Sequence, residues 1–172
     1  NGAQPNPADD QRISEVMTIM GRYYRLRVKS GDRQDWVLDG AVDVLRKLRA
    51  AGIGVAVTTG SAREVGVGKL AASGLADFFP VAAFGDEVDD RVELLRRALK
   101  DAAKVYRRPY LAANAVVIGD APADVQAARL FGARVVAVAT GRYSLDELDE
   151  HGPDATFTDL TNADAVVRAI RG

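Results

Sequence analysis

The chain has 172 residues, of which 48% are hydrophobic and 27% charged. This supplies enough apolar material for one sizeable core with at most a small accessory piece. The net charge of −1 and the lack of a membrane-length apolar run argue against nucleic acid and membranes as partners. The absence of cysteine excludes disulfides, thiolate nucleophiles and cysteine-based metal sites, and it fits a reducing cytoplasm as the location.

The first fifty residues are predicted to form two helices joined by a connector. Apolar side chains recur at helical spacing through 9–28, which predicts an amphipathic helix that begins at Asp9 or Asp10. Residues 29–36 are polar and form the connector, and a second helix is predicted over 40–51.

Short β-branched runs alternate with helical segments from residue 53 to the end of the chain. Such alternation, with nearly continuous apolar strands, predicts a parallel sheet covered by helices on both faces, a three-layer α/β/α arrangement of the Rossmann type. Ligands of such sheets bind beyond the carboxyl ends of the strands, so the residues that follow each strand are the first candidates for a site. The predicted strands are 53–58, 81–84, 115–118, 134–139 and 155–157, and the predicted helices are 62–73, 90–105, 122–131, 144–151 and 163–171.

Two aspartates follow the predicted strand 115–118, one at its tip and one a helical turn later. Asp120 and Asp124 can therefore face one point, and Pro122 suits the first turn of the helix between them. Carboxylates above a sheet edge are suitable ligands for Mg²⁺, which takes few carboxylates and keeps waters and phosphate oxygens. The alternative is that both are acidic residues stabilised by the positive end of the helix dipole. We interpret the pair as a Mg²⁺ site.

Hydroxyl groups follow the predicted strand 53–58. Thr59, Gly60 and Ser61 lie where side-chain hydroxyls and free backbone N–H groups would bind phosphate. Ser61 with Glu64 also matches a capping box at the start of the next helix. Both interpretations are compatible, because Ser61 could cap the helix while Thr59 faces a ligand.

Two cations compete for the role of phosphate clamp. Arg91 begins the predicted helix 90–105, near the carboxyl edge of the sheet, and Lys69 lies one helix earlier. Each is also explained as a solvated surface residue.

Two further features are weak signals for function. Residues 66–71 match a dinucleotide-binding glycine pattern, but they lie inside a predicted helix and do not directly follow a strand. His151, the single histidine, precedes Gly152-Pro153 and is interpreted as a surface turn residue.

Several segments together resemble the haloacid dehalogenase-like (HAD) hydrolase superfamily, near its phosphoglycolate phosphatase-like members. GDAPADVQAAR at 119–129 matches the fourth motif of that family, and VAVTTGS at 55–61 is similar to its second motif, a strand that ends in Thr-Gly-Asn. ATGRYSLDEL at 139–148 resembles a segment common among these phosphatases. The resemblance covers about 40–160.

The resemblance implies a phosphatase mechanism and assigns residues to it. Thr59 would hydrogen-bond the transferring phosphoryl group, and Arg91 or Lys69 would offset its charge. Asp120 would hold Mg²⁺, with Asp124 as a ligand or as support. In the family an aspartate attacks phosphorus to give an aspartyl-phosphate, and a second aspartate protonates the leaving group and then activates water.

The first motif of the family, Asp-x-Asp-Gly-Thr at the end of the first strand, does not occur in these 172 residues. Residues 36–40 imitate it, but Val37 stands at the position of the nucleophile, so we interpret Asp39 as part of a helix start. The resemblance implies that the first strand lies between the strands that carry Thr59 and Asp120. We therefore expect a missing N-terminal segment to complete the sheet. Residues 1–36 are interpreted as the remnant of a helical cap with its connector, and 37–172 as the core without its first strand.

Three functions remain open at this stage. The first is a Mg²⁺-dependent phosphatase for a small phosphorylated metabolite, inactive without its nucleophile strand. The second is a catalytically dead HAD-like module that binds a metabolite or a protein partner. The third is a Rossmann-like nucleotide binder outside the HAD superfamily.

Overall fold

The structure is a computed structural model that describes residues 15–16, 18–23, 31–86, 88 and 90–172. Residues 15–16 and 18–23 are helical, in agreement with the middle of the predicted helix 9–28. The rest of that helix, with its caps at Asp9 or Asp10, lies outside the described residues.

Fourteen named elements follow in the described residues: six α-helices, three 3-10 helices and five strands. Helices and strands alternate as predicted from residue 53 onward. The 3-10 helices are short and were not predicted; one of them falls in the polar connector. In chain order the elements are η1 (Gln34–Trp36), α2 (Ala41–Ala50), β1 (Val57–Thr59), α3 (Arg63–Ala72), η2 (Ala76–Phe78), β2 (Ala82–Phe84), α4 (Arg91–Val105), η3 (Ala112–Asn114), β3 (Val116–Gly119), α5 (Pro122–Phe131), β4 (Arg134–Val138), α6 (Leu145–Asp149), β5 (Ala155–Phe157) and α7 (Ala163–Arg171).

All strand pairs are parallel, as predicted, but the described strands form two sheets rather than one. β1 pairs with β2, and β3, β4 and β5 pair in that order. Strand β1 is also shorter than the predicted strand 53–58, because β2 begins too late to pair with its first residues. The Tyr106 hydroxyl replaces that pairing: it accepts from the Val55 N–H at 3.0 Å and donates to the Val55 carbonyl at 2.9 Å.

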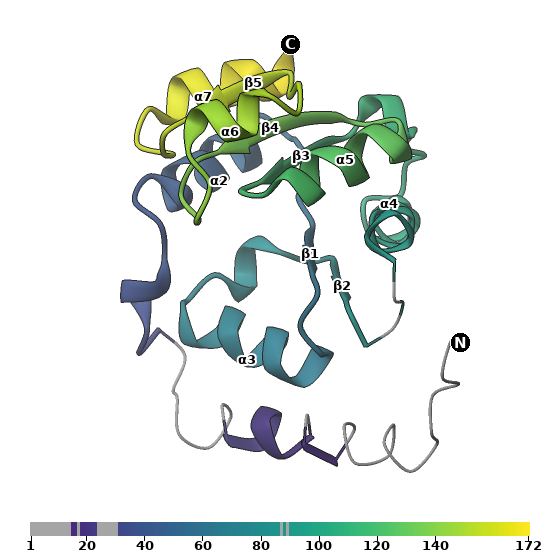
Figure 1. Cartoon of the computed structure of the whole chain (residues 1–172). Coiled ribbons are helices and arrows are strands. Elements are labelled where there is room, and N and C mark those ends of the chain that lie inside the picture. The colour runs from purple at the N-terminus through teal and green to yellow at the C-terminus, as the bar shows by residue number, and fades with distance from the viewer. Residues whose placement is uncertain (1–14, 17, 24–30, 87, 89) are drawn as a thin grey trace, which may run out of the picture.

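Helices cover both faces of the larger sheet (Figure 1). Val136 and Val138 of β4 pack against α2 and α7, whereas Val135 and Ala137 pack against α5 and α6. Side chains of a strand alternate between its two faces, so these two clusters lie on opposite sides of β4. The predicted three-layer arrangement is confirmed for this sheet.

The smaller sheet is also covered by helices. Ala83 of β2 packs with Leu94 and Ala98 of α4. Helix α3 also packs against β2. A Cβ added at Gly66 of α3 would come within 2.5 Å of the Phe84 ring of β2. The helix that contains Gly21 lies beside α3 in turn (Figure 1), since a Cβ at Gly21 would meet the Glu64 Cβ at 2.2 Å.

In the described part of the chain, no helix has the length and apolarity needed to cross a membrane. The cytoplasmic location stays a prediction.

Asp39 lies directly before the start of α2, in agreement with its interpretation as part of a helix start. The N-cap is Gly40, with φ +81° and no side-chain hydrogen bond. A Cβ at Gly40 would lie 2.0 Å from the Leu160 carbonyl oxygen, so the backbone before α7 is packed directly against it. Glycine is required here for two reasons, the left-handed backbone and the missing side chain.

Replacing Gly40 by alanine is expected to lower the free energy of unfolding by about 3 kcal/mol, because a left-handed alanine and a steric clash add. Gly52→Ala is the matched control: φ is +67° at Gly52, but open space surrounds its Cβ position. Gly52→Ala should lower the free energy of unfolding by about 1 kcal/mol. Urea unfolding of both variants beside the parent measures the difference, and equal losses would contradict the close contact with Leu160.

Candidate active site

The acidic turn after β3 is built as the sequence predicts. Strand β3 ends at Gly119, Asp120 follows, and Asp124 lies in the first turn of α5 with Pro122 at the helix start. A Cβ at Gly119 would lie 2.4 Å from the Asp124 Cβ, so the strand tip and the helix turn are in direct contact. Asp120 is exposed, and the side chain of Asp124 is 20% exposed.

A backbone segment after β4 lies against the Asp120 carboxylate. A Cβ at Gly141 would come within 2.3 Å of Asp120 Oδ2. Residues 139–148 resemble a segment common among the HAD phosphatases, but that resemblance does not predict the contact of Gly141 with Asp120. A glycine shortly after a strand was the available signal, and only the fold shows which side chain it accommodates.

Arg91 is the cation that the fold brings to this turn. Its Nη1 lies 2.5 Å from Asp124 Oδ1. Arg91 is the first residue of α4, directly after Asp90, whose side chain accepts a hydrogen bond from the Val92 N–H and so caps the helix. The ion pair joins the N-terminus of α4, which follows β2, to the N-terminus of α5, which follows β3. The carboxyl ends of the two sheets therefore share one edge of the molecule.

Thr59 ends β1 at that edge, and its surroundings correct the predicted capping box. The N-cap of α3 is Ala62, with no side-chain cap hydrogen bond. The Ser61 N–H donates instead to Thr59 Oγ1 at 3.1 Å, which ties the loop to the strand and delays the helix. Because Oγ1 is the acceptor in this bond, the Thr59 hydroxyl hydrogen is left as a donor for a ligand.

The loops after β1 and β2 touch each other through glycines. The Gly85 N–H donates to the Ser61 carbonyl at 3.0 Å, and a Cβ at Gly85 would lie 2.3 Å from the Gly60 carbonyl oxygen. Gly60 is thus held by a contact that the sequence did not reveal. The predicted phosphate-binding residues form one compact loop beside the start of α3.

Lys69 does not lie with these residues in the fold. It is exposed in the last turn of α3, whereas the first turn of that helix follows the Thr59 loop. The glycine pattern at 66–71 also lies within α3. Gly66 and Gly68 are buried, and Gly66 contacts the Phe84 ring. These glycines serve helix packing, as their position inside a predicted helix suggested.

The donor chemistry of the acidic turn fits Mg²⁺. Among residues 15–16, 18–23, 31–86, 88 and 90–172, no three Asp, Glu or His side chains gather as a complete ligand set. Mg²⁺ does not require one, because it is commonly held by one or two carboxylates with waters and substrate phosphate oxygens. Asp120 offers an exposed carboxylate, and Asp124 offers the oxygen that Arg91 leaves over.

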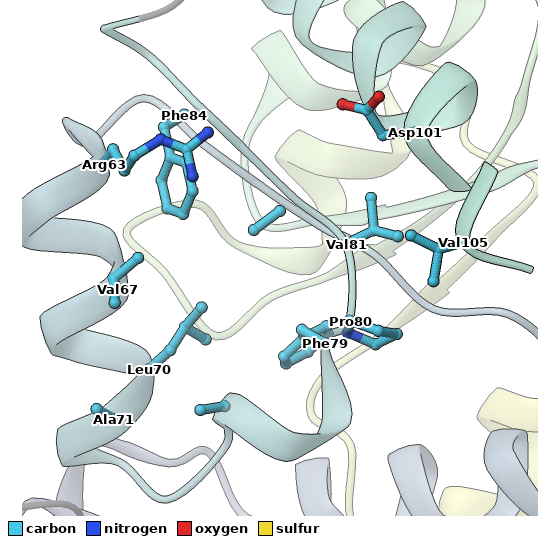
Figure 2. A pocket seen from close by; sticks show the side chains of 12 residues that line it. Arg63, Val67, Leu70, Ala71, Phe79, Pro80, Val81, Phe84, Asp101 and Val105 are labelled. Atoms are coloured by element: carbon cyan, nitrogen blue, oxygen red, sulfur yellow. The ribbon is translucent and has the colours of Figure 1, made fainter. Parts of the chain in front are cut away.

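Two cavities lie among the described residues. The larger, of about 1190 Å³, lies between β1 and β3 and is lined by residues of both strands. The smaller, of about 390 Å³, lies beside β2 between α3 and α4, where the Arg63 guanidinium stacks 4.7 Å from the Phe84 ring centroid (Figure 2). None of the predicted site residues lines either cavity.

Comparison with known proteins identifies the family. The family model for haloacid dehalogenase-like hydrolases matches residues 4–132. The chain belongs to the haloacid dehalogenase-like hydrolase family. This confirms the resemblance and removes the third possibility, a nucleotide binder outside the HAD superfamily.

Relatives within the family include two proteins named as phosphoglycolate phosphatases. One, from Rhodobacter capsulatus, is 30% identical over 74% of this chain and 56% of its own length. The other, from Thiobacillus denitrificans, is 28% identical over 96% of this chain and 69% of its own length. The chain thus spans between about half and two thirds of the length of these relatives.

A solved structure supports the HAD-like fold. A β-phosphoglucomutase from Clostridium difficile superposes with a TM-score of 0.64 at 14% identity, covering 94% of this chain and 65% of the other. At this identity the likeness concerns the fold alone.

Proposed function

We propose that the intact protein is a Mg²⁺-dependent phosphomonoester hydrolase that acts on a small phosphorylated metabolite through an aspartyl-phosphate intermediate. The observation that carries this proposal is the edge shared by both sheets, where the exposed Asp120 stands beside the ion pair of Asp124 and Arg91. Thr59 lies at the carboxyl end of β1 at the same edge. Family membership and the names of the two phosphatase relatives support the same reaction class.

Each side chain has a role set by its position. Asp120 would hold the metal ion, with Asp124 as a second ligand or as support for it. Bound Mg²⁺ supplies positive charge that neutralises the phosphate oxygens. The Thr59 hydroxyl donates to the transferring phosphoryl group, and the Arg91 guanidinium offsets the charge that develops on it.

The nucleophile is proposed to come from a segment outside these 172 residues, because the sequence contains no Asp-x-Asp motif. Its carboxylate oxygen would form a bond to phosphorus while the bond to the leaving oxygen breaks, and the leaving oxygen takes a proton from a neighbouring acid. Water would then release inorganic phosphate. The 172-residue chain by itself would be inactive.

The domain boundaries form part of this proposal. Residues 1–36 would belong to a helical cap with its connector, and residues 37–172 to the core. The Gly31 N–H and the Arg33 N–H donate to the carbonyls of Ala71 and Ala72, both at 2.9 Å, which fixes the connector to the end of α3. A cap attached there would control which phosphate ester reaches the site.

A catalytically dead binding module is the second candidate, favoured by the missing first motif. Hydrolysis of p-nitrophenyl phosphate by the intact protein, with and without EDTA, separates the two. We expect phosphate release that requires Mg²⁺. Saturable phosphate-ester binding without release in the presence of Mg²⁺ would instead establish the binding module.

The choice between the two cations can be tested by paired substitutions. Arg91→Met is expected to lower kcat/KM of the intact protein about 100-fold, because the phosphoryl group loses a facing charge and Asp124 loses its partner. Lys69→Met is the control and should change kcat/KM less than about twofold, since an exposed charge far from the site is weakly felt. The reverse ranking would assign the clamp to Lys69.

A further inference from the structure

Positive charge is concentrated in the second half of α4 and just after it. Residues 96–108 contain six lysines and arginines and a single acidic residue, Asp101, in a chain whose net charge is −1. All six cations are exposed: Arg96, Arg97, Lys100, Lys104, Arg107 and Arg108. Asp101 follows Arg91 by ten residues in the same helix, so a rise of about 15 Å separates this surface from the candidate active site.

The stability of α4 does not account for this concentration of charge. Arg96, Lys100 and Lys104 follow one another at four-residue spacing, where like charges destabilise a helix. The negative end of the helix dipole attracts cations only in the last turn, which contains Lys104. In the described part of the chain, the side chains of Lys100 and Arg107 form no hydrogen bond or ion pair. Their charge is therefore available to attract an anionic group.

Arg107 keeps its charge in a backbone conformation that usually requires glycine. Its φ is +53°, and the N–H of Arg108 donates to the Ala103 carbonyl at 3.2 Å, which closes the helix through a left-handed residue. At the corresponding position after α2 and α3 the chain has Gly52 and Gly74. A left-handed arginine is strained, and such strain is characteristic of functional positions.

The small cavity beside β2 lies against this charged part of α4 (Figure 2). Asp101 and Val105 line it from α4, and Val67 and Leu70 line it from α3. The Lys104 ammonium lies 2.7 Å from the Asp101 carboxylate, so the cationic face of α4 borders the cavity. Val105 is 49% exposed, which shows that the apolar wall of the cavity reaches the surface of the molecule.

Cations stand on two sides of this cavity. Arg63 lines it from α3, across from Asp101 (Figure 2). On the α4 side, the pKa of Asp101 is lowered, first by the hydrogen bond from Lys104. The charge of Lys104, and then the charges of Arg97 and Lys100, lower this pKa further. The cations of α4 are thus close enough to act on a negative group at the wall of the cavity.

We propose that this surface binds an acidic segment of a partner protein, with one apolar side chain of the segment inserted into the small cavity. Carboxylates on either side of that apolar residue would face the cations of α3 and α4. An apolar centre within a polar rim is the usual anatomy of a protein–protein interface. A nucleic acid fits the cavity less well, because the walls are largely aliphatic and the Phe84 ring is fully buried, so it cannot stack on a base.

Fluorescence anisotropy with a labelled model peptide tests the proposal in the intact protein. The probe is a short peptide of glutamates around a single leucine, and a second probe has serine in place of the leucine. We expect saturable binding of the leucine peptide that weakens at least about tenfold when ionic strength rises from about 50 mM to about 300 mM. The serine peptide should bind about tenfold more weakly, because it lacks the side chain that the cavity buries.

Paired substitutions locate the binding surface. Lys100→Gln combined with Lys104→Gln should weaken binding of the leucine peptide about tenfold, because two facing charges are lost. Arg46→Gln combined with Arg168→Gln is the matched control: it removes the same charge from exposed positions of α2 and α7 and should change the affinity less than about twofold. Arg107→Gly should weaken binding while raising the urea midpoint of unfolding, because glycine relieves the left-handed backbone.

Four results would overturn the proposal. The first is a leucine peptide that shows no saturable binding at low salt, or that loses affinity equally in both pairs of variants. The second is a single-stranded oligonucleotide that binds this surface more tightly than the peptide, which would assign the surface to nucleic acid. The third is a dimer in sedimentation that dissociates when Lys100 and Lys104 are replaced, which would assign it to a second copy. The fourth is a parallel loss of phosphate-ester hydrolysis, which would place the peptide in the active site.

Discussion

Replacing Asp120 by asparagine in the intact protein is expected to lower kcat/KM for a phosphomonoester about 100- to 1000-fold, the usual loss when one preorganised electrostatic group is removed. The substitution keeps the shape of the side chain but removes the charge that would hold Mg²⁺ at the strand tip. The Mg²⁺ concentration needed for half-maximal activity should rise as well. Steady-state phosphate release over a range of Mg²⁺ concentrations measures both effects.

Asp146→Asn is the matched control for this substitution. Asp146 is an exposed aspartate in the first turn of α6, so it also lies near a helix N-terminus, but it does not follow β3. Its replacement should leave both kcat/KM and the Mg²⁺ dependence within about twofold of the parent. Unchanged activity in Asp120→Asn, with the fold intact, would rule out the acidic turn as the metal site.

The 172-residue chain on its own is expected to release phosphate at least about 10⁴-fold more slowly than the intact protein, as other enzymes do when the nucleophile is removed. Asp120, Thr59 and Arg91 remain in place, but the proposed nucleophile lies outside this chain. A phosphate-release assay at high protein concentration, with the intact protein beside it, measures the ratio.

Two results would contradict that expectation. Turnover by the 172-residue chain within tenfold of the intact protein would place the nucleophile among the residues of this chain. An intact protein that is equally inactive, although its Mg²⁺ binding is normal, would favour the binding module over the enzyme.

The sequence predicted the acidic turn because all of its determinants are local. The strand, Asp120, Pro122 and Asp124 lie within ten consecutive residues, and Gly132 ends the helix with φ +83°. Most helices were found for the same reason, with ends displaced by one or two residues. The local sequence pattern was therefore sufficient to predict the acidic turn without knowledge of the fold.

Features that depend on contacts between distant segments were missed. The predicted strand 53–58 is shortened because pairing depends on where β2 begins, and Tyr106 takes over at Val55. The predicted capping box of Ser61 failed because the Ser61 N–H donates to Thr59. Residue types alone do not show that these two hydrogen bonds form in place of the predicted ones, because both depend on the geometry of the folded chain.

The contacts that glycines make at the site could not be predicted from the sequence either. Gly141 meets Asp120 and Gly85 meets Gly60, each across a separation that only the folded chain closes. Arg91 was placed correctly by its position at a helix start. Its ion pair with Asp124 could not be predicted, because it requires the relative placement of α4 and α5.

The most direct test of the metal and phosphate assignments is a crystal structure of the intact protein grown with Mg²⁺ and inorganic phosphate. We predict Mg²⁺ about 2.1 Å from a carboxylate oxygen of Asp120, and a phosphate oxygen within hydrogen-bonding distance of the Thr59 hydroxyl. A phosphate bound away from Thr59, or a metal ion that does not contact Asp120, would contradict the account.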